Sequence, residues 1–193
     1  RGVPVLCCFV LIFSWRNVVK RLLLDMDGVI ADFHTGMCNA HMRPSPYNDP
    51  VNYGQFDMAK IWKMSAAEFW SKATVTFWKN LPVMPLASNV VSMCVREFGI
   101  ENICLLSSPA SDAGACMAGK HAWIQKHFPE FKRQFLFGPH KEFCSAPNHY
   151  LVDDCEKNTE KFKNSFLVPR PWNSAWSDAG LSLERLYVWL RNI

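Results

Sequence analysis

The chain has 193 residues, enough for one compact domain with a small inserted subdomain but not for two large domains. Hydrophobic residues make up 49% of it and aromatic residues 13%, an apolar content that disordered chains lack. The formal net charge is only +4 and the basic residues form no run of five or more, so we expect no nucleic acid polymer as a partner.

Eight cysteines raise the alternatives of a disulfide scaffold or a zinc site. No C-x-x-C pair occurs, which removes the usual spacing of zinc ligands. Cys7 and Cys8 are adjacent, which is poor geometry for a mutual disulfide or for binding one metal ion. We therefore expect reduced thiols in a cytoplasmic protein.

The first 18 residues form an apolar leader of uncertain status. Its apolar run, from Val3 to Phe13, is shorter than the about 20 residues that span a bilayer, so we expect no stable membrane insertion. The run is similar to a signal-peptide core, but no small-residue cleavage pattern separates it from the first predicted strand. We favour an appended or mis-started leader over a targeting segment, with the domain beginning near Val19.

From residue 19 onward the sequence alternates between short apolar runs and helical patterns. Each apolar run ends at a polar or turn-forming residue, as a buried parallel strand does. The predicted strands cover residues 22–24, 103–106, 135–137, 150–152 and 165–168, and the predicted helices cover residues 86–98, 120–128 and 155–163. Strands that alternate with helices predict an α/β, Rossmann-like fold with a doubly wound parallel sheet.

The segment of residues 34–85 breaks this alternation. Prolines divide its first part into turns, and the stretch from Ser65 to Glu68 then has the form of a capping box that predicts a helix through Phe77. The segment is also rich in aromatic residues. We interpret it as a small helical cap inserted after the first strand, with residues 19–33 and 86–193 forming the core domain.

Polar side chains follow the predicted strands at the points where the strands end. In an open parallel sheet, ligands bind at the carboxyl ends of the strands. The residues at these ends are Asp25 and Asp27, Ser107, and Asp153 and Asp154, with Lys141 following the third strand. Four carboxylates brought together would repel one another without a cation, and oxygen ligands with room for water favour magnesium. We therefore expect Mg²⁺ to be bound by the four aspartates.

Each of these residue types suits one part of a phosphoryl transfer. Asp25 is a carboxylate that can attack phosphorus, and Asp27 can protonate the leaving oxygen and later deprotonate the attacking water. Gly28 allows a tight bend that brings backbone amides near the phosphate. Ser107 can donate a hydrogen bond to a phosphoryl oxygen, and Lys141 can neutralise charge there and on Asp25.

The motifs resemble those of the haloacid dehalogenase (HAD) superfamily. The stretch from Asp25 to Phe33 reads D-M-D-G-V-I-A-D-F and is similar to motif I. Ser107 matches motif II, Lys141 motif III, and the pair Asp153 and Asp154 motif IV, in the order that the superfamily uses. The resemblance implies a HAD-like core and a magnesium-dependent phosphatase with an aspartyl-phosphate intermediate on Asp25.

Within that superfamily the chain resembles the 5'(3')-deoxyribonucleotidases, from about Lys20 to Phe166. That family shares this form of motif I, a hydroxyl-Ser-Pro motif II like residues 107–109, and a helix like residues 120–128. The resemblance implies a base pocket lined by Phe33, Phe56 and Trp70. The alternative for these rings is that they only fill the core of the cap. Ser108 is either a substrate ligand or part of the turn before the proline.

These observations lead us to expect a phosphomonoester hydrolase acting on (deoxy)ribonucleoside monophosphates. One alternative is a HAD phosphatase for a sugar phosphate or another small phosphomonoester, but the aromatic cap favours a nucleobase. A non-catalytic, metal-binding relative is a further alternative, disfavoured because Asp25 and Asp27 are both present. A homodimer is left open.

Overall fold

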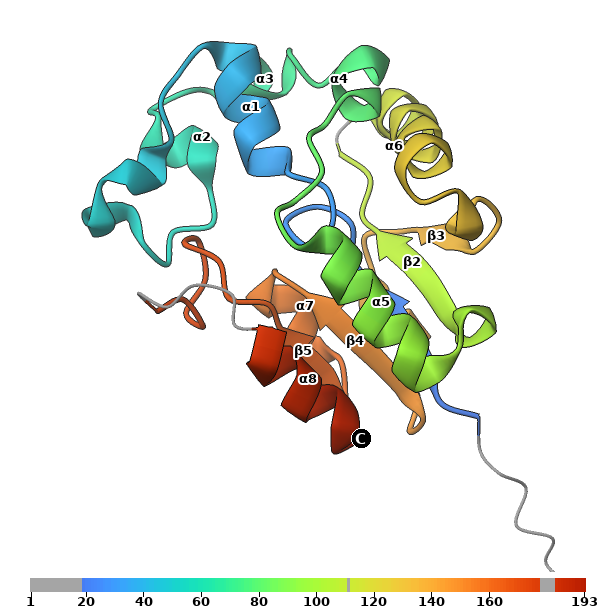
Figure 1. Ribbon diagram of the computed structural model, residues 1–193. Helices are drawn as coiled ribbons and strands as arrows, with labels where there is room; N and C mark the ends of the chain where they lie inside the picture. Colours follow the sequence, from blue (N-terminus) through green and yellow to red (C-terminus); the bar gives the residue numbers. More distant parts are fainter. Residues whose placement is uncertain (1–18, 111, 178–182) are drawn as a thin grey trace, which may run out of the picture.

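The computed structural model describes residues 19–110, 112–177 and 183–193, so the expected leader at residues 1–18 lies outside the described residues. Its strands form one sheet in the order β3-β2-β1-β4-β5, and each neighbouring pair is parallel (Figure 1). The strands are β1 Arg21–Leu24, β2 Ile103–Ser107, β3 Phe135–Phe137, β4 His149–Asp153 and β5 Ser165–Leu167. The five predicted strands and the α/β, Rossmann-like fold are confirmed.

The two faces of the sheet bury different side chains because residues along a strand alternate in direction. On one face, Leu22 and Leu24 join a large apolar cluster with α5 (Ala87–Phe98) and α8 (Leu183–Arg191), two helices in contact with each other (Figure 1). On the other face, Leu23 packs with Phe162, which directly follows α7 (Glu156–Lys161). Both faces are therefore covered, and the carboxyl ends of the strands form the edge where polar groups gather.

Two helices of the core differ from the prediction. The helix predicted at residues 120–128 is longer: α6 spans Ala113–His127, because the side chain of Asp112 accepts a hydrogen bond from the backbone N–H of Ala115 and caps an earlier start. Helix α8 was not predicted, although Leu186 and Leu190 on one side of it are buried.

The segment between β1 and α5 contains only short helices and lies over the carboxyl-end edge of the sheet (Figure 1). Its helices are α1 Phe33–His41, α2 Met58–Ile61, α3 Ala66–Trp70 and α4 Val75–Lys79, with 3₁₀ turns at Pro46–Asn48 and Pro50–Asn52. Further 3₁₀ turns in the core are Ile100–Asn102, Pro129–Phe131 and Lys141–Cys144. The single helix predicted through Phe77 is wrong. It ends at Trp70, and a second helix begins where Thr74 caps the backbone N–H of Phe77.

The two ends of this segment pack differently. Helix α4 lies against α6, and Trp78 belongs to the same apolar cluster as the residues of the sheet. The other part has a small apolar cluster of its own, which includes Met37, Met58 and Phe69. One end of the cap is thus continuous with the main core, and the other end is stabilised locally.

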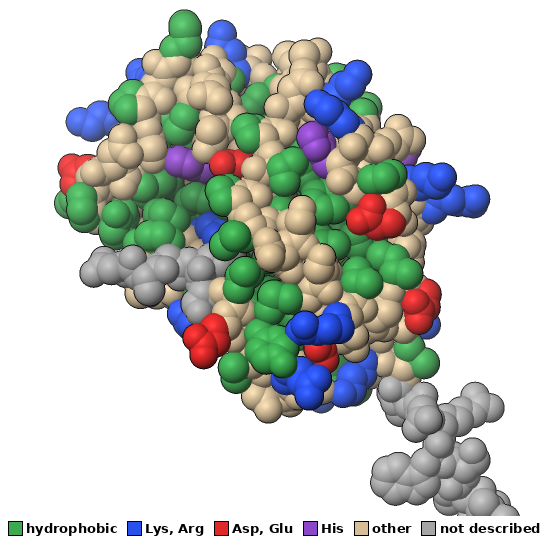
Figure 2. All heavy atoms as spheres, viewed as in Figure 1, with side chains coloured by type: hydrophobic (Ala, Val, Ile, Leu, Met, Phe, Trp, Pro, Cys, Tyr) green, Lys and Arg blue, Asp and Glu red, His purple; other side chains and the backbone are tan. Residues whose placement is uncertain are grey.

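Among the residues that the structure describes, no helix combines the length and the apolar character needed to cross a bilayer. On the face in Figure 2, Lys and Arg side chains lie in several separate places rather than in one continuous patch.

Candidate active site

The loop after β1 carries the first two candidate residues. Asp25 directly follows the strand, and its backbone N–H donates to the carbonyl of Val152 at 2.9 Å, which continues the pairing of β1 with β4. This contact fixes Asp25 beside the end of β4, where the residue is 5% exposed. The loop then turns back on itself through a hydrogen bond from the N–H of Gly28 to the carbonyl of Ala31, at 2.8 Å.

Gly28 is required at its position for two reasons. Its φ of +73° is a left-handed conformation that other residues rarely adopt. A Cβ at this position would also lie 2.1 Å from Oδ2 of Asp154, far inside van der Waals contact. The absence of a side chain thus lets the loop after β1 approach the end of β4, where Asp153 and Asp154 lie.

Three buried carboxylates meet where β1 and β4 end. Asp25, Asp153 and Asp154 each place one oxygen within 4.8 Å of the others, and none of them is more than 6% exposed. Lys141 reaches this cluster from the 3₁₀ turn after β3: its Nζ lies 2.6 Å from Oδ1 of Asp25 and 2.7 Å from Oδ2 of Asp153. The structure therefore brings together four of the residues that the sequence placed at the strand ends.

The electrostatics of this cluster favour a bound cation. Burial raises the pKa of Asp153 to about 6, with the charge of Asp25 adding to the rise and Lys141 opposing it. Burial also raises the pKa of Asp154 well above its usual value, again with Asp25 and Asp153 adding to it. For Lys141, burial lowers the pKa, but the two carboxylates outweigh it and raise the value overall. One ammonium thus faces three carboxylates, which leaves excess negative charge.

Asp27 lies apart from this triad because a different lysine holds it. Nζ of Lys120, on α6, is 2.5 Å from Oδ2 of Asp27, and Lys120 itself is fully buried. Oδ1 of Asp27 is buried and has no hydrogen-bond partner among the described residues. Burial raises the pKa of Asp27; Lys120 opposes this rise and Asp25 adds to it. The expected role of Asp27 as a fourth metal ligand stays a prediction.

The two serines at the end of β2 occupy different environments. Ser107 is 1% exposed, and its hydroxyl accepts a hydrogen bond from Lys120 at 2.7 Å, so it does not line the cavity described below. Ser108, one residue later, does line that cavity and donates a hydrogen bond to the carbonyl of Gly138 at 3.3 Å. The structure therefore places Ser108, rather than Ser107, beside the space that a substrate would occupy.

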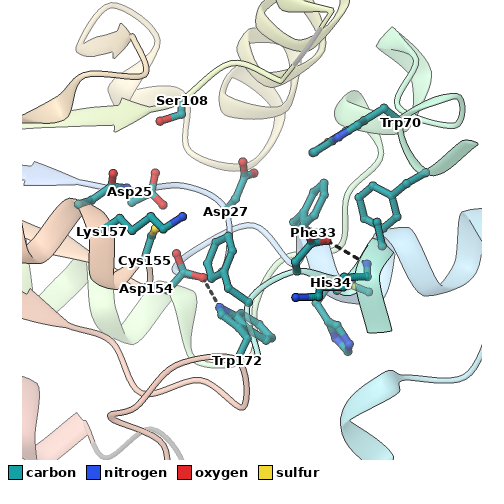
Figure 3. Close-up of a pocket in the computed structure, with 18 of the residues that line it drawn as sticks. Asp25, Asp27, Phe33, His34, Trp70, Ser108, Asp154, Cys155, Lys157 and Trp172 are labelled. Atoms are coloured by element: carbon teal, nitrogen blue, oxygen red, sulfur yellow. Dashed lines mark hydrogen bonds between the residues drawn. The ribbon is translucent and has the colours of Figure 1, made fainter. Parts of the chain in front are cut away.

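A cavity of about 720 Å³ opens between the triad and the cap. Asp25, Asp27 and Asp154 lie at one side of it, and Phe33 and Trp70 of the cap lie at the other (Figure 3). The residues predicted for substrate binding, Gly28, Phe33, Phe56, Trp70 and Ser108, all line this cavity. The cavity is thus acidic at the sheet and aromatic at the cap.

The comparisons with known proteins give little beyond the fold. No family model matches the chain, and no curated protein matches it. Among solved structures, the chain is similar to one described as "Crystal Structure analysis of a Dehalogenase", with a TM-score of 0.48, 10% sequence identity, and coverage of 89% of this chain and 97% of that chain. At these values the similarity carries no weight for function, so the function is inferred from the side chains of the site.

The triad fits a hard divalent cation. Its ligand atoms are all carboxylate oxygens, the type that Mg²⁺ and Ca²⁺ prefer, and it contains no nitrogen or sulfur ligand of the kind that zinc favours. Asp25 and Asp154 both line the cavity, so the cluster borders it. The three aspartates could therefore hold a metal ion next to the space available for substrate.

Lys120 is the site residue that sequence reasoning missed. It lies within the helix pattern of residues 120–128, but a lysine in a helix is usually exposed and gave no separate signal. The sequence analysis also missed three residues in the segment that follows β5, because this segment lies beyond the stretch that resembles the known family. They are Arg170, Trp172 and Asn173.

Proposed function

We propose that the protein is a HAD-like hydrolase, a phosphatase that transfers the phosphoryl group to Asp25. The observation that carries the proposal is the buried triad of Asp25, Asp153 and Asp154, held by Lys141 and open to a cavity of about 720 Å³. A non-catalytic role would not explain why a nucleophilic carboxylate lines the same cavity as a second carboxylate, Asp27, that has a raised pKa.

The proposed reaction has two steps. In the first, a carboxylate oxygen of Asp25 attacks phosphorus, the phosphorus–oxygen ester bond breaks, and the carboxyl group of Asp27 donates its proton to the leaving alcohol. In the second, a water oxygen attacks phosphorus, Asp27 takes a proton from that water, and the bond between phosphorus and the Asp25 oxygen breaks, which releases inorganic phosphate and restores the carboxylate of Asp25. Two observations support this assignment: Asp27 lines the cavity, and burial raises the pKa of its carboxyl group, which favours the protonated form that the first step needs.

The remaining residues orient and neutralise the phosphoryl group. Lys141 keeps Asp25 in place through its hydrogen bond, and Ser108 offers a hydroxyl at the cavity wall. A magnesium ion bound by the three aspartates would neutralise negative charge on the phosphoryl group. We keep magnesium as the proposed metal, because the ligands are all oxygen atoms.

The reaction is tested by Asp25→Asn, which preserves the shape of the side chain but removes the nucleophile. We expect loss of turnover of para-nitrophenyl phosphate in the presence of magnesium, with an unchanged circular dichroism spectrum. Substantial activity in this variant would exclude a covalent intermediate on Asp25.

For the substrate, we propose nucleoside monophosphates, with a nucleobase against the aromatic wall. Support comes from Phe33 and Trp70, whose ring centroids are 5.9 Å apart and which both line the cavity. A sugar phosphate would gain less from such a wall. The cytoplasmic location and a homodimer stay predictions from the sequence.

The base pocket is tested by Trp70→Ala. Loss of stacking of about 1–3 kcal/mol should reduce kcat/KM for nucleoside monophosphates by about tenfold or more, with a much smaller loss for para-nitrophenyl phosphate. Trp62→Ala is the matched control, because Trp62 packs on Phe69 in the cap but does not line the cavity. An equal loss on both substrates, or the same pattern for Trp62→Ala, would contradict the base pocket.

A further inference from the structure

The segment after β5 returns to the two loops that form the site. Nε of Arg170 donates to the carbonyl of Gly28 at 2.5 Å, and Nδ2 of Asn173 donates to the carbonyl of Asp154 at 2.8 Å. Between them, Nε1 of Trp172 donates to the side-chain Oδ2 of Asp154 at 2.6 Å. Arg170 and Asn173 thus bond backbone carbonyl groups, whereas Trp172 bonds the side-chain carboxylate of Asp154, a member of the triad.

The indole ring of Trp172 is fixed from the opposite side by the cap. Its centroid lies 5.4 Å from that of His34 on α1 and 5.7 Å from that of Tyr47. Trp172 is 8% exposed and belongs to the apolar cluster of the cap. Figure 3 shows the ring between the carboxylate of Asp154 and the side chain of His34. A ring packed in this way has little freedom to rotate, so the position of its N–H group is set by the cap.

We propose that Trp172, whose ring is held by the cap, is a positioning residue that orients Asp154 for metal binding. The proposal rests on the function proposed above, in which Asp154 is a metal ligand. Hydrogen-bond donors behind a metal ligand fix its orientation, and their loss typically reduces metal affinity by about 10–100-fold. Because Asp154 has one oxygen held by the indole, its carboxylate cannot turn freely in the metal-free protein.

The test is Trp172→Phe, which keeps an aromatic ring against His34 and Tyr47 but removes the N–H donor. Mg²⁺ affinity is measured by isothermal titration calorimetry on the full chain, at a temperature where circular dichroism shows it to be folded. We expect the dissociation constant for Mg²⁺ to rise by about 10–100-fold.

Trp123→Phe is the matched control. Trp123 is fully buried, its Nε1 donates to the carbonyl of Leu81 at 2.8 Å, and it does not line the cavity. The same substitution there removes an equivalent buried hydrogen bond, so we expect a lower melting temperature and unchanged Mg²⁺ affinity.

The outcomes separate this inference from the proposed function. If the unaltered protein binds no Mg²⁺, both the proposed metal site and the proposed role of Trp172 are wrong. If the unaltered protein binds Mg²⁺ and Trp172→Phe binds equally well, only the role of Trp172 is overturned, and the same holds if Trp123→Phe loses as much affinity. Should Trp172→Phe fail to fold, Trp172→Met, which is also apolar and carries no N–H or O–H donor, is measured in its place, and unchanged affinity in that variant overturns the role.

Discussion

Two buried lysines act as the internal counter-ions of the acidic loops. An ammonium group removed from water needs hydrogen-bond acceptors, since an isolated buried charge is very costly. Lys120 uses its three N–H donors on Oδ2 of Asp27, the hydroxyl of Ser107 and the carbonyl of Ser108, at 2.5, 2.7 and 2.8 Å. It therefore ties the loop after β1 to the end of β2, as Lys141 ties the ends of β1 and β4.

Removal of the Lys120 charge should destabilise the protein. Lys120→Met keeps a long apolar side chain but leaves the carboxylate of Asp27 without its counter-ion. Breaking a fully buried pair costs about 3–5 kcal/mol, and we expect a smaller loss here because the Asp27 side chain is 26% exposed. The free energy of unfolding is measured in urea.

Lys126→Met provides the control for this variant, because Lys126 lies on the same helix and is exposed. Its effect should stay within about 0.5 kcal/mol. Adding Asp27→Asn to Lys120→Met should recover part of the lost stability, because it removes the uncompensated charge. Equal stability of the two lysine variants would show that the ion pair contributes nothing.

At the scale of elements, the contact between α4 and α6 fixes one end of the cap to the core. It depends on Gly119 of α6, where a Cβ would lie 2.4 Å from Cβ of Trp78 and 2.7 Å from the carbonyl oxygen of Val75. Trp123, one turn further along α6, donates to the carbonyl of Leu81 just after α4. The two helices thus approach more closely than a larger residue would allow.

Gly119→Ala is expected to destabilise the protein even though alanine favours a helix. Overpacking costs about 1–3 kcal/mol, against a gain in helix propensity of about 1 kcal/mol, and rotation of a side chain cannot relieve the clash with the backbone oxygen of Val75. Gly114→Ala on the same helix is the control. The nearest atom to its Cβ is 3.6 Å away, so the melting temperature should stay level or rise. A higher melting temperature for Gly119→Ala would contradict the close packing of α4 and α6.

At the scale of the whole molecule, a metal ion bound at the proposed site would make metal binding part of the folding equilibrium. Asp25 follows β1 and Asp153 ends β4, two strands that are far apart in sequence, so an unfolded chain does not present the two carboxylates together. A cation that binds only the folded protein stabilises it by mass action, by about 2.7 kcal/mol at a concentration 100 times the dissociation constant.

Mg²⁺ should therefore raise the melting temperature of the EDTA-treated protein. For a chain of this size, 2.7 kcal/mol corresponds to an increase of about 5–10 °C. Asp154→Asn should show a much smaller increase, because it removes a charged ligand. Asp57→Asn, a change at an exposed carboxylate that lines the same cavity, should keep the full increase. A melting temperature that is independent of Mg²⁺ in the unaltered protein would contradict metal binding at the triad.

The parts of the fold that follow from local pattern were predictable, and the parts that depend on distant contacts were not. The run of Leu22 to Leu24 before Asp25 marks a buried strand without any knowledge of its neighbours. The break before Thr74 was missed because a side-chain cap within an apolar, aromatic stretch gives a weak signal. The positions of the aspartates followed from the rule for strand ends, but the partners of Lys120 and Trp172 depend on how the chain folds back.

The hydrogen bond between Arg170 and Gly28 has a consequence for synthesis, because the two residues are made at different times. Arg170 donates to the carbonyl of Gly28 across 142 residues of chain. At about 5–20 residues per second, the ribosome adds Arg170 about 7–28 s after Gly28. During that interval the nascent chain carries Asp25, the proposed nucleophile, on a loop that lacks this contact. Translation products that stop before residue 170 would therefore carry Asp25 on a loop that lacks the hydrogen bond from Arg170, and they would also lack the contacts of Trp172 and Asn173 with Asp154.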